Sequence, residues 1–502
     1  MALLVQIVPI AVMLAILAAV FAAIYYERAS RPVIGLSGAI ATVFAGEVLG
    51  IYSVESAFQS IFFSTLVLLV SMNAITTIVK RNGVFDWIAY QLLVRLGFDY
   101  RRIFISLVLA TYFFSTMVNN LTVVLIVVPL TLRVMDTIKR DPIPLVVVEI
   151  ISTNLGGAST MVGDFPNMII AAGVGIGFDA FATFMLPICL FFVLLLTILS
   201  VSVFYPKEFK QTGTERNGES LVKEHLKRHF IVQRNAAVKD RIGLLISLAF
   251  FFGVLGMFIF SGNLGLPPSL ISMTAAILLL LVDQIRARRE ELKSFRGRKL
   301  SHEERMQIRN NLDRRMSEIF GVLRWDATGF LAGLFVIVGG LEATGFLELI
   351  AHWVVDFSRS NIVLVSIMII MVAPFITMFT EAGPSTALML SMIKALNVAI
   401  PYDVSWWALS LGVQAGSSAT MVGATEGPAA AAQVEEHYRN LSVSYRLTPS
   451  ALSRIGLPML PVFVIGSAIY VTLVITMGPV APMLFLAISA ILAIALLLKY
   501  FR

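Results

Sequence analysis

Long apolar segments, each sufficient to span a bilayer as a helix, alternate along the chain with short polar connections. They cover 3–26, 32–53, 58–79, 142–176, 180–204, 241–261, 267–284, 325–343, 402–434, 450–475 and 478–499. A membrane-spanning helix needs about 20 mostly apolar residues, so each of these segments predicts one crossing. Two more segments, 103–137 and 361–398, are too long for one helix and break at Asn119-Asn120 and Thr380-Glu381. Each of these two is predicted to be a helical hairpin.

Two of the apolar segments are interrupted by polar and glycine-rich residues. One interruption runs from Asn154 to Asn167 (NLGGASTMVGDFPN), and the other from Gly416 to Glu426 (GSSATMVGATE). Hydrocarbon offers no partner for free backbone groups, so a broken helix at that depth must lie inside protein or line a polar cavity. Two broken helices in matching halves of a chain are typical of the midplane binding site of a secondary transporter.

Three landmarks recur along the chain at a nearly constant distance. GVFDWIA at Gly83 matches GFLELIA at Gly345, Met117 matches Met378, and the tetrapeptide TMVG recurs 260 residues after Thr160. An almost constant offset predicts an internal repeat. Each repeat has an odd number of crossings, so the two repeats should be inverted relative to each other, as alternating access requires.

Composition narrows the class of protein. The 502 residues are 58% hydrophobic and 14% charged, and the mean hydropathy is +0.87, which predicts an all-α polytopic membrane protein. The net charge of +7 comes from loops beside apolar spans, as the positive-inside rule expects, and needs no nucleic acid to explain it. The single cysteine, Cys189, offers neither a disulfide nor a thiolate metal site. We expect no cofactor, no resident metal and, because no histidine-based dyad lies at depth, no enzyme.

Basic residues also predict the topology. Loops 207–241 and 286–324 are rich in Lys and Arg, and so are both ends of segment 103–137, so all of these should be cytoplasmic. Segment 103–137 is then a re-entrant hairpin, and the second hairpin must enter from the outside. Eleven crossings and two hairpins result, with the amino terminus outside and the carboxyl terminus in the cytoplasm. Segment 3–26 fits a first membrane helix better than a cleaved signal.

These features predict five regions. They are scaffold helices at 1–57, a first inverted repeat at 58–204, cytoplasmic loops with two linking helices at 205–324, a second inverted repeat at 325–475, and a carboxyl-terminal helix at 476–502. The hairpins lie at 103–137 and 361–398, and the broken helices at 142–176 and 402–434. Amphipathic stretches at 82–97 and 345–358 should lie flat at the membrane interface. The stretch 286–324 should contain a charged, solvated helix.

Three carboxylates are predicted at mid-membrane depth, namely Asp164, Glu381 and Glu426, with no Lys or Arg beside them. A charge at the bilayer centre costs about 2.5–3.5 kcal/mol on insertion scales, so such residues are functional candidates. A buried carboxylate that holds either a proton or a hard cation provides the minimal chemistry of exchange. Neutral oxygen and amide groups around the breaks complete the predicted ion site: Asn119, Asn120, Thr122, Asn154, Ser159, Thr160, Asn167, Thr380, Ser385, Thr386, Ser417, Ser418 and Thr420.

Each of these assignments has a structural alternative. Asn119 and Asn120 could cap the hairpin helices, and Asp164 could cap the helix that begins near Pro166. Glu381 could reach the surface at the hairpin tip and be solvated. The half-helix amino ends could also hold an anion in place of a cation.

The chain resembles the ion transporter superfamily, in particular its arsenite-permease and sodium/proton-antiporter branch, which includes the melanosomal P protein. The resemblance rests on STMVNNLT at 115–122, EIISTNLGG at 149–157 with GDFPN at 163–167, and the LFVIVGGLE core within 325–345. It implies a scaffold domain, a transport domain with two opposed hairpins, a homodimer and an elevator motion. The second repeat departs from the family pattern, because Thr380-Glu381 and Glu426 place carboxylates where asparagines are common.

The residues and the resemblance together predict a proton-coupled cation antiporter of the sodium/proton type in a plasma (bacterial inner) membrane. Its partners would be the ion, the proton, the bilayer and a second copy. An arsenite or di- or tricarboxylate permease is the alternative, although the predicted lack of a basic residue in the site disfavours a multivalent anion. An ion channel is a third possibility.

Overall fold

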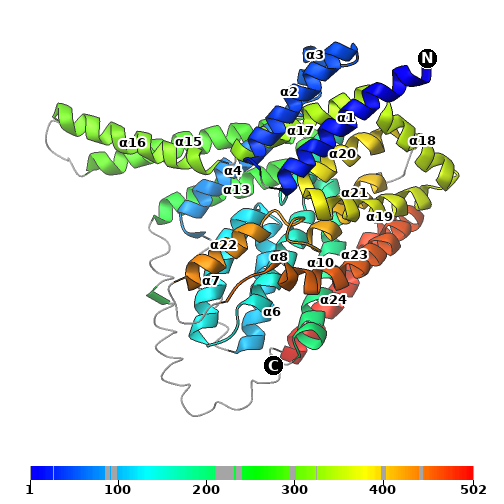
Figure 1. The fold of residues 1–502 in the computed structure, drawn as a ribbon. Coiled ribbons are helices and arrows are strands. Elements are labelled where there is room, and N and C mark those ends of the chain that lie inside the picture. The colour runs from blue at the N-terminus through cyan, green and yellow to red at the C-terminus, as the bar shows by residue number, and fades with distance from the viewer. Residues whose placement is uncertain are drawn as a thin grey trace.

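The computed structural model describes residues 2–26, 28–84, 87, 91, 99–206, 209, 231–232, 240–293, 301–323, 325–396, 403–439 and 445–500. In this part of the chain every regular element is a helix (Figure 1). Eleven helices are long and apolar enough to span a membrane. They are α1 (Ala2–Tyr25), α2 (Arg31–Leu49), α4 (Phe63–Arg81), α7 (Asn120–Thr137), α10 (Phe178–Leu199, continued by a π-helical turn at Ser200–Phe204), α13 (Arg241–Ile259), α15 (Pro268–Lys293), α17 (Trp325–Ala343), α19 (Ile362–Thr380), α23 (Pro449–Met477) and α24 (Val480–Tyr500). The predicted class, an all-α polytopic membrane protein, is confirmed.

The eleven helices are not the same eleven segments that the sequence predicts. Helices α7 and α19 are arms of the two predicted hairpins, whereas each broken segment consists of two short helices. The first hairpin pairs α6 (Tyr100–Ser115) with α7, and the second pairs α19 with α20 (Ala382–Ala395). The broken segments are α8 (Ile143–Ala158) with α9 (Phe165–Val174), and α21 (Val404–Ser417) with α22 (Gly427–Tyr438). All four interruptions therefore lie where the polar residues predict them.

Glycines let each broken segment approach its hairpin closely. A Cβ atom on Gly156 would lie 2.3 Å from the backbone oxygen of Tyr112, so only glycine allows α8 so near to α6. In the same way, a Cβ atom on Gly416 would lie 2.6 Å from the backbone oxygen of Pro374, where α21 meets α19. Gly416 follows Gly156, and Pro374 follows Tyr112, by nearly the same number of residues that separates the repeated sequence landmarks. They support an internal repeat, while the inverted relation of the halves remains a prediction.

Helices α2 and α17 form a tightly packed pair beside the second hairpin. A Cβ atom on Gly35 would lie 2.8 Å from the Phe330 side chain. A Cβ atom on Gly333 would lie 2.5 Å from the Gly35 carbonyl group. Small residues in such a stripe let two membrane helices pack backbone to backbone. Helix α17 also packs against α20, so this pair borders the tip region of the second hairpin.

The remaining helices surround these parts. The short helices α3 (Val54–Gln59) and α14 (Ser261–Leu264) lie between spans, and α3 occupies the start of the predicted span 58–79. The predicted amphipathic stretch at 345–358 forms helix α18 (Phe346–Ser358), and its position at the membrane interface stays a prediction. Most of the stretch 82–97 lies outside the described residues. Helix α16 (His302–Val322) confirms the charged helix and projects with α15 away from the main body (Figure 1).

Candidate functional site

The two broken segments meet directly, as the sequence predicts. Asn154 Nδ2 donates to the Ser417 carbonyl at 3.4 Å, and Ser410 Oγ donates to Asn167 Oδ1 at 2.7 Å. All of these residues are buried. Hydrogen bonds between parts of the chain separated by more than 240 residues fix the position of one break against the other.

Asp164 lies at the first break and takes part in a buried polar network. Its Oδ1 accepts from the Phe165 amide at 2.8 Å at the start of α9, and its Oδ2 accepts from Asn120 Nδ2 at 2.9 Å. Asn120 also donates to Asn154 Oδ1 at 3.3 Å and accepts from Ser115 Oγ. Asp164 therefore caps a helix and at the same time connects the hairpin tip to the broken segment. The capping alternative and the network occur together.

Glu426 lies at the second break and is fully buried. Its Oε1 accepts from Thr153 Oγ1 at 3.3 Å, which connects the second break to α8. Its Oε2 has no hydrogen-bond partner among the residues that the structure describes. The carboxylates of Asp164 and Glu381 are close enough to interact with it electrostatically. A buried carboxylate in these surroundings requires a proton or a cation to neutralise it.

Glu381 forms an ion pair that the sequence prediction excluded. The Arg31 guanidinium, at the start of α2, donates to Glu381 Oε1 at 2.6 Å. The prediction that no basic residue accompanies the carboxylates is therefore wrong. It failed because 350 positions separate the two residues and only the tertiary structure brings them together. The solvated alternative for Glu381 is also wrong, since the residue is 7% exposed.

The backbone at Glu381 is unusual. Its φ of +72° and ψ of 163° place a residue with a side chain in a region that mostly glycine adopts. This conformation ends α19 and begins α20 without an intervening loop. Strained backbone of this kind tends to persist at functional sites because the surroundings hold it in place. The residue with this backbone conformation is the one that pairs with Arg31.

A small cavity adjoins this ion pair. It has a volume of about 40 Å³ and is lined by residues that include Arg31, Phe165, Asp326, Glu381 and Thr425. Phe165 and Thr425 are the sequence neighbours of Asp164 and Glu426, so the cavity lies beside both breaks. One water needs roughly 10–15 Å³, so this space of about 40 Å³ holds about three waters or a small ion that has lost most of its hydration shell. A tricarboxylate does not fit in this conformation.

Thr160 and Thr420 occupy equivalent positions but are tied to the backbone. The hydroxyl of Thr160 donates to the Thr116 carbonyl and accepts from the Gly163 amide, and that of Thr420 does the same with Met378 and Gly423. Each threonine thus fastens a broken segment to its hairpin. The structure gives them a positioning role, and ion binding by these hydroxyls remains a prediction.

Most of the other predicted ligands also make local hydrogen bonds. Asn119 caps α7 through the Leu121 amide, Asn167 Nδ2 donates to the carbonyls of Gly157 and Thr160, and Ser159 contacts Tyr112 and the Leu155 carbonyl. Hydroxyls that donate to carbonyls within the preceding turn belong to Thr380, Ser385, Thr386 and Ser417, and Ser418 accepts from Gln414. Thr122 is half-buried on α7. Asn120, Asn154, Asp164, Glu381 and Glu426 make the longer-range polar contacts of the site, and ion binding by any of the predicted residues stays a prediction.

Several residues of the site carry no signal in the sequence. Arg31 and Asp326 stand at the beginnings of α2 and α17, where charged residues mark any span end, yet both line the cavity. Thr153 and Gln414 lie inside apolar helices one turn from the breaks and bond to Glu426 and Ser418. The helical period could have placed Thr153 and Gln414 on the side facing the break, but it could not have identified Arg31.

The ion pair leads to a testable expectation. Arg31→Gln and Glu381→Gln should each lower the initial transport rate about tenfold, and the double variant should lower it by the same factor, because paired residues are not additive. Arg28→Gln, an exposed neighbour, is the matched control and should retain the wild-type rate. Initial rates in proteoliposomes measure all four. Multiplicative loss in the double variant, near 100-fold, would show that the two residues act independently.

The fold and the site together define a polytopic helical membrane transporter. Residues 6–295, more than half of the chain, match the citrate transporter family, and the chain belongs to this family within the ion transporter superfamily.

Similar proteins agree with this assignment. The magnetosome protein MamN of Magnetospirillum gryphiswaldense is 31% identical over 91% of this chain and 98% of its own, and MamN of Paramagnetospirillum magneticum is 29% identical over 92% and 98%. The human P protein is 24% identical over 89% of this chain and 58% of its own, which confirms the resemblance inferred from the motifs. Among solved structures, the YdaH transporter of Alcanivorax borkumensis shares the fold at a TM-score of 0.54, with 12% identity over 90% of this chain and 99% of its own.

Proposed function

We propose that this protein is a proton-coupled cation antiporter of the sodium/proton type. The observation that carries the proposal is the buried Glu426 carboxylate. Its Oε2 has no hydrogen-bond partner in the described part of the chain, and the Asp164 carboxylate is near enough to interact with it electrostatically. Two such carboxylates cannot both be ionised in a dry site without a compensating positive charge. A proton or a metal cation supplies that charge, and the two compete for the same oxygen atoms.

The arrangement of the site suggests how exchange would proceed. With a proton on Glu426, only Asp164 carries a negative charge, which is the same net charge that the two ionised carboxylates have with one monovalent cation bound. When a cation enters, it binds the carboxylates of Asp164 and Glu426, and the proton leaves. In the described part of the chain no three acidic, histidine or cysteine side chains are placed to hold one metal together. The cation would therefore take its other ligands from carbonyl, amide or hydroxyl oxygens, which hard cations accept readily.

The size of the cavity favours a small ion. A volume of about 40 Å³ beside the two breaks accommodates a cation with only part of its hydration shell, while pockets for small organic ligands are about 300–1,000 Å³. Oxygen atoms on both breaks would replace part of the hydration shell. The cavity lies between the α2–α17 pair and the second hairpin tip, which is a position where a change in packing could open it to one side.

A second candidate function is the permeation of an organic anion or arsenite. The family is described as a citrate transporter family, and Arg31 places a positive charge in the cavity wall, which a carboxylate substrate could use. Arg31 already pairs with Glu381, so an anion would have to displace that carboxylate.

Proteoliposomes with a trapped pH indicator distinguish the two. We expect external sodium or lithium, but not potassium or choline, to collapse an imposed pH gradient, while labelled citrate and arsenite remain outside. Accumulation of citrate or arsenite with no cation-dependent proton movement would instead establish the permease. Vesicles without protein and vesicles with Glu426→Gln serve as controls.

A further inference from the structure

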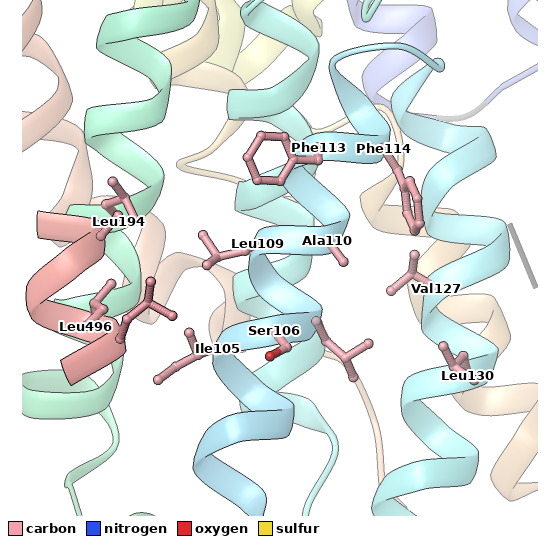
Figure 2. Close-up of a pocket in the computed structure, with 13 residues that line it drawn as sticks. Ile105, Ser106, Leu109, Ala110, Phe113, Phe114, Val127, Leu130, Leu194 and Leu496 are labelled. Atoms are coloured by element: carbon pink, nitrogen blue, oxygen red, sulfur yellow. The ribbon is translucent and has the colours of Figure 1, made fainter. Parts of the chain in front are cut away.

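A second cavity lies away from the candidate site, between the first hairpin and the carboxyl-terminal helix. It has a volume of about 460 Å³ and is formed by α6, α7, α10 and α24. Figure 2 shows Ile105, Leu109 and Ala110 in its centre, Val127 and Leu130 on one side, and Leu194 and Leu496 on the other. Ser106 is the only polar residue among those that line it. We call this cavity the apolar groove.

Water is a poor occupant of the apolar groove, because an apolar cavity offers it too few polar partners. The volume falls within the range of about 300–1,000 Å³ that is typical of small-ligand pockets. Phe113 and Leu497, two of the lining residues, are each 54% exposed, so the groove opens on the outer surface of the helices. In a membrane protein that surface is in contact with hydrocarbon, and an acyl chain is the matching occupant.

Three basic residues, one on each of three helices, lie at one end of the apolar groove. Arg102 precedes Ile105 by three residues on α6, Arg133 follows Leu130 by three on α7, and Lys499 follows Leu496 by three on α24. Residues three apart on a helix share a face, so each helix continues its groove-lining face with a positive charge. We call Arg102, Arg133 and Lys499 the basic rim.

Contacts between the helix ends show that the basic rim is gathered at a single end of the groove. Arg102 Nε donates to the Tyr500 carbonyl at 3.3 Å, which brings the start of α6 to the end of α24. The Arg140 guanidinium lies 5.6 Å from the centre of the Tyr100 ring, which brings the segment after α7 to the same place. The nearby Asp99 carboxylate accepts from the amides of residues 101 and 102. An apolar slot that ends in several positive charges matches the two parts of an anionic phospholipid.

We infer that the apolar groove and the basic rim form a binding site for an anionic phospholipid of the bilayer, with an acyl chain in the groove and the phosphate at Arg102, Arg133 and Lys499. The site is separate from the carboxylate site and does not depend on the proposed transport function. Its lipid would stabilise the contact between the first hairpin and α24, because both contribute walls.

Thermal unfolding of the full-length protein in mild detergent tests this inference. Dioleoyl phosphatidylglycerol should raise the unfolding temperature more than dioleoyl phosphatidylcholine, which has the same chains without the net charge, and inorganic phosphate alone should have no effect, since a ligand stabilises only the state that binds it. Equal shifts with the two lipids, or a shift with phosphate alone, would overturn the inference.

Two variants test the two halves of the site separately. Ala110→Phe should fill the groove and abolish the difference between the lipids. Lys499→Gln combined with Arg133→Gln should weaken the apparent affinity for phosphatidylglycerol about 25-fold, at roughly fivefold per charge. Arg309→Gln with Arg314→Gln removes the same charge from the exposed face of α16 and should have no effect. The unfolding temperature without lipid checks that each variant is folded.

A second copy of the chain is the competing occupant. If Ala110→Phe converts a dimer into a monomer in light scattering, while the response to phosphatidylglycerol is unchanged, the groove is an interface between subunits and the lipid assignment is wrong.

Discussion

Glu426→Gln is expected to lower cation-driven proton exchange by at least 100-fold, which corresponds to about 2.7 kcal/mol of barrier. Glutamine retains an oxygen that can accept from Thr153 Oγ1, so the link between the second break and α8 can persist. What it cannot do is exchange a proton for a cation. Because the substitution also removes a buried charge near Asp164, we expect the unfolding temperature to stay the same or rise.

Glu149→Gln provides a closely matched control for Glu426→Gln. Glu149 is also fully buried, and its Oε1 also accepts from a threonine, Thr131, at 2.6 Å. Its Oε2, like that of Glu426, has no hydrogen-bond partner among the described residues. It lies within α8, well before the break at 159–164. Exchange by Glu149→Gln should remain within a few-fold of wild type. Equal loss in both variants would mean that any buried carboxylate in this bundle supports the fold, and that Glu426 has no special part in coupling.

Gly157→Ala is expected to reduce transport more than tenfold by displacing the network around Asp164. A Cβ atom there would lie 2.4 Å from Asn120 Oδ1 and 2.9 Å from Asp164 Cβ, so both side chains would have to move. Overpacking of this kind lowers the free energy of unfolding by about 1–3 kcal/mol. It would also lengthen the 2.9 Å hydrogen bond from Asn120 to Asp164. Initial exchange rates and the unfolding temperature, measured on the same preparation, should both fall.

The control for this substitution is Gly253→Ala. Gly253 also lies inside a helix, α13, but nothing comes within 4 Å of a Cβ atom placed there. Alanine is a better helix former than glycine by about 1 kcal/mol, so stability should be unchanged or slightly higher and transport should not change. Wild-type transport by Gly157→Ala would show that the spacing between Asn120 and Asp164 is not critical.

The fold was predictable from the sequence to the extent that the hydrophobic effect determines it. Apolar length located most of the spans, although two of the eleven long helices are hairpin arms. Glycine, proline and polar residues located all four interruptions, because a break in a helix at membrane depth must lie inside protein or beside a polar cavity. Helix ends were harder to predict. The region between α2 and α4 contains the additional helix α3, whose amino end is capped by the Ser53 side chain. Apolar composition alone does not resolve such a short element.

The candidate site was predictable only in part. The pairing of the two breaks followed from the repeat, and Asp164 and Glu426 followed from the cost of burying a carboxylate. The hydroxyl groups of Thr160 and Thr420 were harder to interpret, because a hydroxyl in a broken helix can bind either a solute or the backbone, and the sequence looks the same in both cases. Arg31 could not be found at all. Its partner Glu381 lies in the other half of the chain, and no local pattern connects them.

The hydrogen bonds between the two breaks restrict where this protein can move. Since Asn154 is bonded to Ser417, Thr153 to Glu426 and Ser410 to Asn167, sliding one broken segment along the other would leave buried polar groups without partners. We therefore expect both segments to travel as one body. The interface that opens and closes during transport would then be the one between the α2–α17 pair and the second hairpin. There the half-exposed Arg31 guanidinium pairs with Glu381 at the hairpin tip. Because dissolved salt screens an exposed ion pair, the rate of the conformational change would depend on ionic strength even if the affinity for the transported solute does not.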